Sequence, residues 1–434
     1  MQSTKGMITM NMEALIAAAG QAQRAGRPAE AEALFRQVLS QGGEHPLALN
    51  TLGMRALKAG ENTEAAALFR RAIAADARAP ELHLNLARAL RAVGDDAGER
   101  AALEGALALD QRHFMALVRL AELFERTGDD QGAASRWGNV LALAVQIDDR
   151  PPALEAMLVH AREVVTRHQA GFAAAVDGGL AAEREGVESA ARRRFDACVD
   201  HALGRRAIYA NHCHGLHFPF LPPDEFFERS HFPWMEGIEA KTDVIRAELE
   251  ALLAADAARF SPYVAMDPGT PENKWSALDH KLDWSALHLW RHGKRDDAVC
   301  ARCPETAAAM EALPLADMPG RAPTVFFSIL KPGTHLPAHT GVTNVRAIIH
   351  LPLIVPEGCT FRVGGDTRTW RVGEAWAFDD TIEHEAWNRS DQIRAVLIFD
   401  VWNPHLSEEE RRLLQAFFPV ADRHGYDLRA APGD

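Results

Sequence analysis

The chain has 434 residues, more than one hydrophobic core usually accommodates, so two or three domains are expected. Its formal net charge of −13 argues against nucleic acid or an anionic membrane as a partner, because either would favour a basic surface. Five cysteines are a sparse and odd set, which fits a reducing cytoplasm better than a disulfide-stabilised scaffold.

The first residues, MQSTKGMITMNMEALIAAAG, contain one lysine and no long apolar run, so we expect no signal peptide. No apolar stretch of the chain approaches the roughly 18 residues of a membrane span, so we expect no membrane partner. The methionines at positions 1, 7, 10 and 12 leave the true start codon open.

Residues 10–145 repeat with a constant period. AGRPAEAEALFRQVL at 25–39 returns as AGENTEAAALFRRAI at 59–73. Glycines recur every 34 residues, at Gly26, Gly60, Gly94 and Gly128. Large residues keep the same register in the following segment, at Phe35, Phe69, Leu103 and Trp137. Such a period predicts paired helices that stack into a solenoid, with each glycine ending a helix where positive φ costs little.

This pattern resembles a tetratricopeptide array of about three to four units. Such arrays present a concave surface to peptides or proteins, so a protein partner is implied. A scaffold or a dimerisation arm without a peptide client stays open, because a fold alone does not fix a role. Oligomeric state cannot be read from this pattern.

Residues 146–207 keep helical character but lose the repeat register, and we interpret them as a helical connector. The stretch AARRRFDACVDHALGRR at 190–206 is basic and amphipathic. In so acidic a chain, a solvated helix that joins two domains is a better interpretation of this stretch than a nucleic-acid contact.

Residues 208–434 change in character. Prolines and aromatic residues become frequent near 211–234, and 238–256 reads as one helix. After residue 320, six short runs rich in β-branched and aromatic residues alternate with Gly, Pro or Asp turns: TVFFSIL, VRAIIHLPLIV, CTFRVGG, TRTWRVG, EAWAFDD and IRAVLIFDVW. They predict an antiparallel sandwich or jelly roll, whose open end suits a small molecule.

His339 stands at the mouth of one predicted strand, and His384 begins another after an Asp-rich turn. Two neutral imidazoles on neighbouring strands can bind a divalent transition metal. The alternative for any pair among 19 histidines is a structural, hydrogen-bonded role.

Three features point to an anion beside this pair. Arg346, Ile348 and His350 alternate along one strand, so their side chains share one face. Arg394 lies in an apolar strand, where a guanidinium usually needs a carboxylate partner. Ser328 precedes the first histidine and offers a hydroxyl donor. Together they describe a metal beside a pocket for a small dicarboxylate.

The stretches FFSILKPGTHLPAHTGVTN, HLPLIVPEGC, FDDTIEHEAWN and VLIFDVWNP resemble the aspartyl/asparaginyl β-hydroxylase family over roughly residues 208–408. This resemblance implies an Fe(II)- and 2-oxoglutarate-dependent oxygenase on a double-stranded β-helix, which is a variant of the jelly roll. Some members carry tetratricopeptide repeats ahead of it. The implied fold class is therefore α+β multidomain, with an all-α solenoid before residues 208–434.

The resemblance also implies residue roles at the iron. His339 and His384 would be the iron ligands, and Gly341 would stand where other oxygenases of this class place a carboxylate ligand. Acidic neighbours are expected in turns and in hydrogen bonds around the site rather than on the metal: Asp379, Asp380, Glu383 and Glu385.

For the cosubstrate, Arg394, assisted by Ser328, would hold the distal carboxylate of 2-oxoglutarate, and His350 would lie near its other end. Animal members have an arginine where this chain has Ile348. Because Arg346 shares the strand face of Ile348, it is the expected substitute.

Two further clusters are expected to be without special chemistry. Cys300 matches a disulfide-bonded cysteine of animal members, but the partner position is Ala307, and Cys303 completes a local CARC. We expect unreactive thiols there. The stretch NHCHGLH at 211–217 is expected to be a loop with chance histidines.

The implied activity is hydroxylation at Cβ of an Asp or Asn residue in a protein or peptide that the repeats recruit. Two alternatives stay open. One is a hydroxylase of a small-molecule or lipid-linked acyl substrate. The other is a non-catalytic tetratricopeptide adaptor, which the presence of both histidines and Arg394 disfavours.

Overall fold

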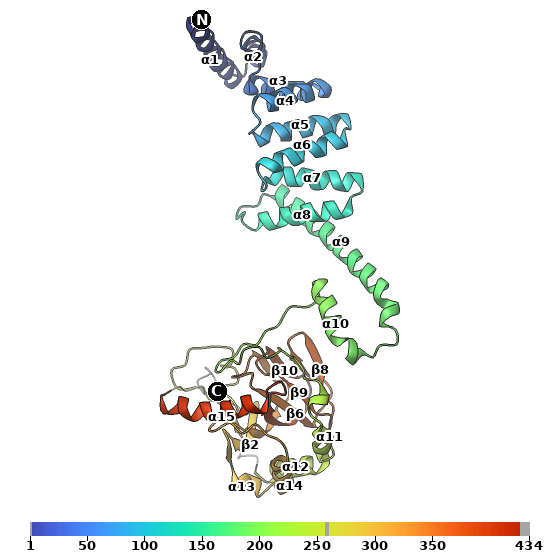
Figure 1. Ribbon diagram of the computed structural model, residues 1–434, viewed down its shortest axis with the longest axis vertical. Coiled ribbons are helices and arrows are strands. Elements are labelled where there is room, and N and C mark those ends of the chain that lie inside the picture. Colours follow the sequence, from blue (N-terminus) through green and yellow to red (C-terminus); the bar gives the residue numbers. More distant parts are fainter. Residues whose placement is uncertain (1, 257–259, 426–434) are drawn as a thin grey trace. The chain divides into compact units, whose positions relative to one another are not determined.

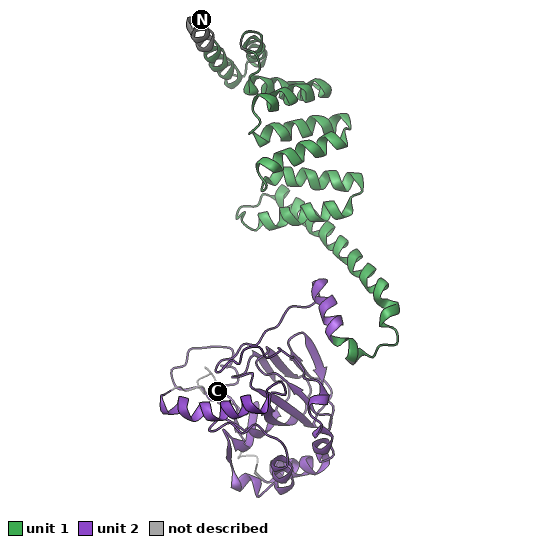
Figure 2. Cartoon of the chain, in the orientation of Figure 1, with its two compact units in different colours: residues 1–193 green, residues 194–434 purple. Residues whose placement is uncertain are grey.

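The computed structural model describes residues 2–256 and 260–425. The chain divides into two compact units, Met1–Arg193 and Arg194–Asp434, shown in Figure 2. The division falls within helix α10 (Ser189–Ala202).

The first unit is a helical repeat solenoid, as predicted, and its helices stack in pairs (Figure 1). The pairs are α1 (Gln2–Arg24) with α2 (Pro28–Gly42), α3 (Pro46–Ala59) with α4 (Asn62–Ala75), α5 (Pro80–Val93) with α6 (Asp96–Leu109), and α7 (Phe114–Thr127) with α8 (Asp130–Ala144). Gly60, Gly94 and Gly128 end α3, α5 and α7 with φ of 82°, 77° and 77°. The repeat glycines therefore terminate helices in the left-handed conformation that the sequence predicted.

The core of the solenoid consists of the large residues that keep the repeat register. All four are buried: Phe35, Phe69, Leu103 and Trp137. The small residues of the repeat allow this packing, because a Cβ built on Gly53 would lie only 2.7 Å from Cε1 of Phe69. Helix α9 (Pro152–Arg184) follows and buries Leu158, Ala161 and Val164 against the same core.

The second unit begins with short helices and then forms two antiparallel sheets. The helices before the sheets are η1 (Arg229–His231), α11 (Met235–Glu239) and α12 (Thr242–Asp256). The single helix predicted over 238–256 is wrong at its start, because the chain breaks between α11 and α12, where the Thr242 hydroxyl donates to the Glu239 carbonyl.

Eleven strands are described: β1 (Ser261–Pro262), β2 (Trp284–Arg291), β3 (Lys294–Arg295), β4 (Val325–Leu330), β5 (His335–His339), β6 (Arg346–Ile354), β7 (Cys359–Val363), β8 (Asp366–Thr369), β9 (Trp376–Phe378), β10 (His384–Asn388) and β11 (Arg394–Trp402). The larger sheet has the order β1-β2-β4-β11-β6-β9 with β3 on β2, and the smaller has β5-β10-β7-β8. The pairs β4–β11, β5–β10, β6–β9 and β7–β8 are nested, which is the strand order of a jelly roll.

The larger sheet is covered on both faces. One face packs on α12 and on α14 (Pro304–Glu311), with Leu249, Met310 and Phe327 in that cluster. The other face and the smaller sheet share a second cluster that includes Phe361 and Val396. The remaining helices are α13 (Asp297–Cys300) and α15 (Glu408–Arg423). No helix among the described residues is long and apolar enough to cross a membrane.

Cys300 and Cys303 are buried in the helix-covered cluster. Their thiols donate to the carbonyls of Leu289 and Val299. Burial raises the pKa of both thiols, that of Cys303 to about 12, so both stay protonated at neutral pH. Neither is in a disulfide, in line with the expectation of unreactive thiols.

Candidate active site

A cavity of about 490 Å³ lies between the two sheets of the second unit. All six residues singled out from the sequence line it: Ser328, His339, Arg346, His350, His384 and Arg394. They come from β4, β5, β6, β10 and β11, so the nested strand order brings together positions up to 66 residues apart. This cavity is the candidate active site.

His339 ends β5 and His384 begins β10, and the two residues are register partners. Their ring centroids are 4.1 Å apart. The Nδ1 of His339 lies 2.7 Å from the Pro337 carbonyl oxygen, and that of His384 lies 3.0 Å from the Ile382 oxygen. A carbonyl only accepts, so each Nδ1 carries the proton and each Nε2 keeps a lone pair for a metal.

The electrostatics favour the neutral form of both rings. Burial lowers the pKa of His339 well below its ordinary value, and the neighbouring His384 lowers it further. Burial also lowers the pKa of His384. Because a neutral imidazole is the metal-binding form, this pair fits a divalent transition metal.

Gly341 leaves room for a carboxylate that comes from another part of the chain. A Cβ built on Gly341 would overlap the carboxyl group of Asp380, and the Gly341 amide donates to the Asp380 carbonyl at 2.5 Å. In the described part of the chain, no three His, Cys, Asp or Glu side chains form a metal-binding group. The space that a larger residue at 341 would fill is therefore occupied by the Asp380 side chain.

Arg346 holds that carboxylate in place. Its Nη2 lies 3.2 Å from Oδ2 of Asp380, and its Nη1 lies 3.1 Å from Oδ2 of the buried Asp400. Burial raises the pKa of Asp400 to about 6, and the Arg346 charge opposes this rise. Asp380 was expected in hydrogen bonds around the site, whereas Asp400 was not anticipated, and the expected contact of Arg346 with a cosubstrate stays a prediction.

Arg394 is 2% exposed, and no carboxylate lies within ion-pair distance of it among residues 2–256 and 260–425. Its Nη1 makes only long contacts, 3.4 Å to the Ser328 hydroxyl and 3.5 Å to the Ser328 carbonyl, while its Nε has no hydrogen-bond partner there. Burial lowers the pKa of Arg394 to about 10. A buried cation without a counter-charge is costly, so this position fits an anionic ligand.

His350 lies near Arg394 and is also neutral. Burial lowers its pKa well below the ordinary value, and the Arg394 charge adds to the effect. The Trp370 indole donates to His350 Nδ1 at 3.4 Å, so the remaining proton is on Nε2. His350 therefore offers a donor to an oxygen of a ligand, within a wall that contains Phe361 and Phe378.

Comparison with known proteins relates part of this unit to one family. Residues 239–404 match the sequence model of the Aspartyl/Asparaginyl beta-hydroxylase family. The second unit is therefore similar to that family over this range.

The chain is 41% identical over 141 residues to human aspartyl/asparaginyl beta-hydroxylase, which covers 32% of this chain and 18% of that protein. It is 36% identical over 181 residues to the ornithine lipid ester-linked acyl 2-hydroxylase of Rhizobium tropici, which covers 41% of this chain and 60% of that protein. The chain thus spans under a fifth of the human relative and three fifths of the rhizobial one.

Among solved structures, similarity extends to MamA from Desulfovibrio magneticus RS-1, at 21% identity and a TM-score of 0.30 over 32% of this chain and 78% of that chain. It also extends to an O-GlcNAc transferase mutant of Thermobaculum terrenum, at 27% identity and a TM-score of 0.29 over 32% and 26%. TM-scores this low do not indicate a function.

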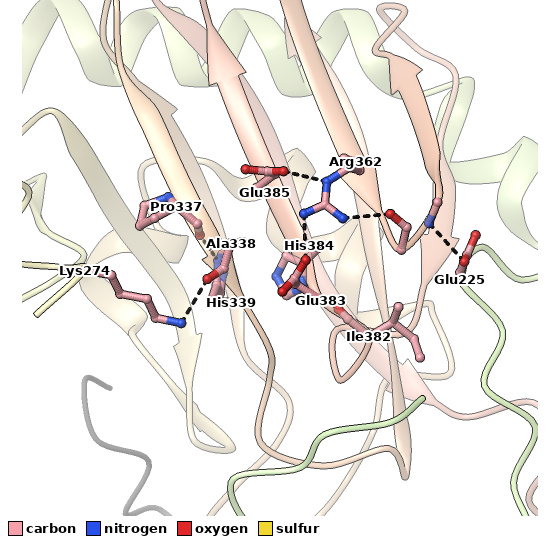
Figure 3. A network of polar contacts seen from close by, with 12 residues as sticks. Glu225, Lys274, Pro337, Ala338, His339, Arg362, Ile382, Glu383, His384 and Glu385 are labelled. Carbon is pink, nitrogen blue, oxygen red and sulfur yellow. Dashed lines mark hydrogen bonds and ion pairs between the residues drawn. The ribbon is translucent and has the colours of Figure 1, made fainter. Parts of the chain in front are cut away.

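On the outer side of the second unit, Arg362 holds the strand that carries His384, as Figure 3 shows. Arg362 binds Glu383 at 2.8 Å and Glu385 at 2.5 Å, and it donates to the Gly364 carbonyl at 2.7 Å. Since the two glutamates flank His384, their side chains point away from the metal position. They position β10.

The segment 211–217 forms part of the cavity wall of the second unit, which sequence reasoning missed. The His214 amide donates to the Gly341 carbonyl at 3.2 Å, and the Gly215 amide donates to the Val342 carbonyl at 2.8 Å. His214 Nε2 lies 3.1 Å from the Thr340 hydroxyl, and its side chain lines the cavity. The expected chance loop is therefore wrong for His214, whose partners lie 126 residues away and leave no local signal.

Asp379, the other acid of the predicted turn, also binds this segment. Asn211 donates to its Oδ2 at 2.7 Å, and the Thr381 hydroxyl donates to its Oδ1 at 2.6 Å. Burial raises the pKa of Asp379 to about 7. Its contacts are hydrogen bonds that anchor the 211–217 segment beside the turn before β10.

Proposed function

We propose that the second unit is an Fe(II)- and 2-oxoglutarate-dependent hydroxylase. The observation that carries this proposal is the buried Arg394, which has no carboxylate partner in the described chain and shares one cavity with two neutral imidazoles. A dicarboxylate cosubstrate would supply the missing anion, and a ferrous ion would use the two lone pairs.

His339 and His384 would hold the iron, since each ring is fixed by a carbonyl bond at Nδ1. Arg394, with the Ser328 hydroxyl beside it, would bind the distal carboxylate of 2-oxoglutarate. His350 would donate from Nε2 to the cosubstrate. When bound, iron and 2-oxoglutarate would, together with O₂, supply the oxidising chemistry that converts a C–H bond to C–OH: one oxygen atom of O₂ would enter the hydroxyl group and the other succinate, with release of CO₂.

The remaining residues orient groups and exclude water. Asp380, held by Arg346, presents a carboxylate beside Gly341, where a hydrogen-bond acceptor can orient water or substrate. The rings of Phe361, Phe378 and Trp370 surround His350 and keep this end of the cavity dry.

For the substrate, we propose an Asp or Asn side chain of a peptide or protein, hydroxylated at Cβ and recruited by the repeats of the first unit. The 41% identity to the human hydroxylase and the helical repeat array support this choice. The second candidate is an acyl substrate, small or lipid-linked, which the 36% identity to the rhizobial acyl 2-hydroxylase supports.

The test is succinate formation by the full chain with Fe(II) and 2-oxoglutarate, measured alone, with Asp- and Asn-containing peptides, and with acyl lipids. We expect turnover that a peptide stimulates and that Arg394→Gln abolishes. The matched control is Arg389→Gln, an exposed arginine at the end of β10 whose side chain binds Thr360 outside the cavity. Absence of both iron binding and succinate would favour a non-catalytic adaptor and overturn the proposal.

A further inference from the structure

Four arginines line the cavity, and their ion-pair and hydrogen-bond partners distinguish their roles. Arg321 binds Asp422 at 2.6 Å, and Arg346 is held by two carboxylates, as described above. Arg394 is assigned to the cosubstrate. Arg291 is exposed and has no hydrogen-bond or ion-pair partner within the described residues, so its charge is available to a ligand.

A β-bulge turns Arg291 into the cavity. Trp284 and His288 of β2 face the cavity, and the register with β4 shifts between His288 and Trp290. Because of this shift, Leu289 and Trp290 both pack in the cluster on the opposite face, and Arg291 returns to the cavity side. Bulges of this kind commonly re-aim a side chain beside an active site.

A continuous row of rings leads from the proposed iron ligands toward Arg291. We call the rings of Trp284, Tyr263, Phe326 and His288 the aromatic track; all four line the cavity. Successive centroids are 3.8, 5.5 and 5.1 Å apart. The track begins beside His339, whose ring is 6.3 Å from that of Trp284. Such a surface binds an apolar or aromatic group.

The far end of the aromatic track is basic. His288 is followed by Arg291 and by His292, which adopts a φ of 52° in the turn after β2. Non-glycine residues in this left-handed region concentrate at functional sites. Burial lowers the pKa of His288 to about 4, and the charges of Arg291 and His292 also lower it.

We propose that the aromatic track and Arg291 form a substrate subsite that takes an apolar residue of a peptide followed by an acidic side chain at Arg291. This inference rests on the proposed function for its peptide class. The helical repeats suit a peptide, and the cavity lining also offers polar groups to a main chain, from His214, Thr340 and Thr343. β2 spans about 23 Å from Trp284 to Arg291 at 3.3 Å per residue, the length of about seven extended residues, so the acid lies within roughly seven residues of the target.

The test measures binding by calorimetry with the full chain, Fe(II) and 2-oxoglutarate under nitrogen, so that no turnover occurs. The probes are blocked peptides with one Asn target, one leucine beside it and one Glu placed two to six residues away on either side, each paired with its Gln counterpart. We expect at least one Glu peptide to bind about tenfold more tightly than its Gln partner. Arg291→Gln should reduce this preference to less than about twofold, and Arg291→Lys should keep part of it.

The matched control is Lys294→Gln. Lys294 lies directly opposite Arg291 in the β2–β3 register but does not line the cavity, so its loss should leave the preference unchanged. The proposal is overturned if no Glu peptide is preferred or if Arg291→Gln keeps the preference. A preference seen only for dodecyl phosphate over dodecanol would also overturn it, in favour of an amphiphilic lipid. Because binding is read without turnover, failure of the hydroxylase proposal appears separately, in the succinate assay.

Discussion

Replacing Arg394 by methionine should stabilise the ligand-free second unit and abolish its response to 2-oxoglutarate. Burial lowers the pKa of Arg394 to about 10, well below its ordinary value, so the folded state disfavours the charged form. At pH 7 the Arg394 guanidinium is charged in both the folded and the unfolded state, and its charge destabilises the fold. This penalty is relieved only as the pH rises past the pKa of the folded state. A shift of this size corresponds to about 3 kcal/mol.

Methionine fills much of the same volume without a charge, although it loses the contact of the guanidinium with Trp370, whose ring centroid is 4.9 Å away. We therefore expect a net gain of about 2 kcal/mol in the free energy of unfolding, or roughly 4–8 °C in the Tm of the second unit. Thermal unfolding followed with and without 2-oxoglutarate measures both effects.

A matched control is Arg362→Met. Arg362 is paired with Glu383 and Glu385, so its loss removes one ion pair from each carboxylate, leaving Glu385 with His335, and should lower the Tm. If Arg394→Met lowers the Tm of the ligand-free protein and 2-oxoglutarate still stabilises the variant, the charge of Arg394 is balanced by something other than a bound anion, and the reasoning fails.

Three further substitutions test other parts of the structure. His384→Ala should lower iron content, measured by metal analysis, to a small fraction of wild type, and an unchanged content would exclude this residue as a ligand. Gly341→Ala should cost about 1–3 kcal/mol in chemical denaturation because its Cβ overlaps Asp380, and the added substitution Asp380→Ala should recover most of the loss; additive losses would contradict the overlap. Gly53→Leu should unfold the solenoid by displacing Phe69 while succinate formation without peptide persists, and a normal Tm of the first unit would refute the packing argument.

The sequence predicted the solenoid well because its signals are local and periodic. Each of Gly60, Gly94 and Gly128 ends a helix through its own backbone conformation, which needs no information from distant residues. Strands β6 and β11 were also predicted, since long runs of β-branched residues suit a strand buried on both faces.

Strands with weaker patterns were harder to predict. β2 is buried on both faces over most of its length, so WSALHLWR shows no alternation of polar and apolar residues, and this strand was missed. β5 contains Pro337 and was also missed. The strand predicted to begin at His384 is confirmed as β10, although in HEAWN two polar residues precede the only aliphatic one. β5 and β10 pair with each other and so complete the smaller sheet. This pairing joins residues that are far apart in the sequence, so a local sequence pattern does not indicate it.

Contacts with residues distant in the sequence also distinguish the half-buried Arg346 from the buried Arg394 at the proposed cosubstrate site. In sequence, Arg346 and Arg394 look alike, since each begins a strand of apolar residues. In the fold, Arg346 meets carboxylates 34 and 54 residues away and becomes part of the framework that holds Asp380. Arg394 meets only a serine and an indole, so its charge remains to be matched from outside the described chain. Partners rather than residue type thus decide which arginine stabilises the protein and which binds a ligand. The same criterion distinguishes Arg291 from Arg321 at the other end of the cavity.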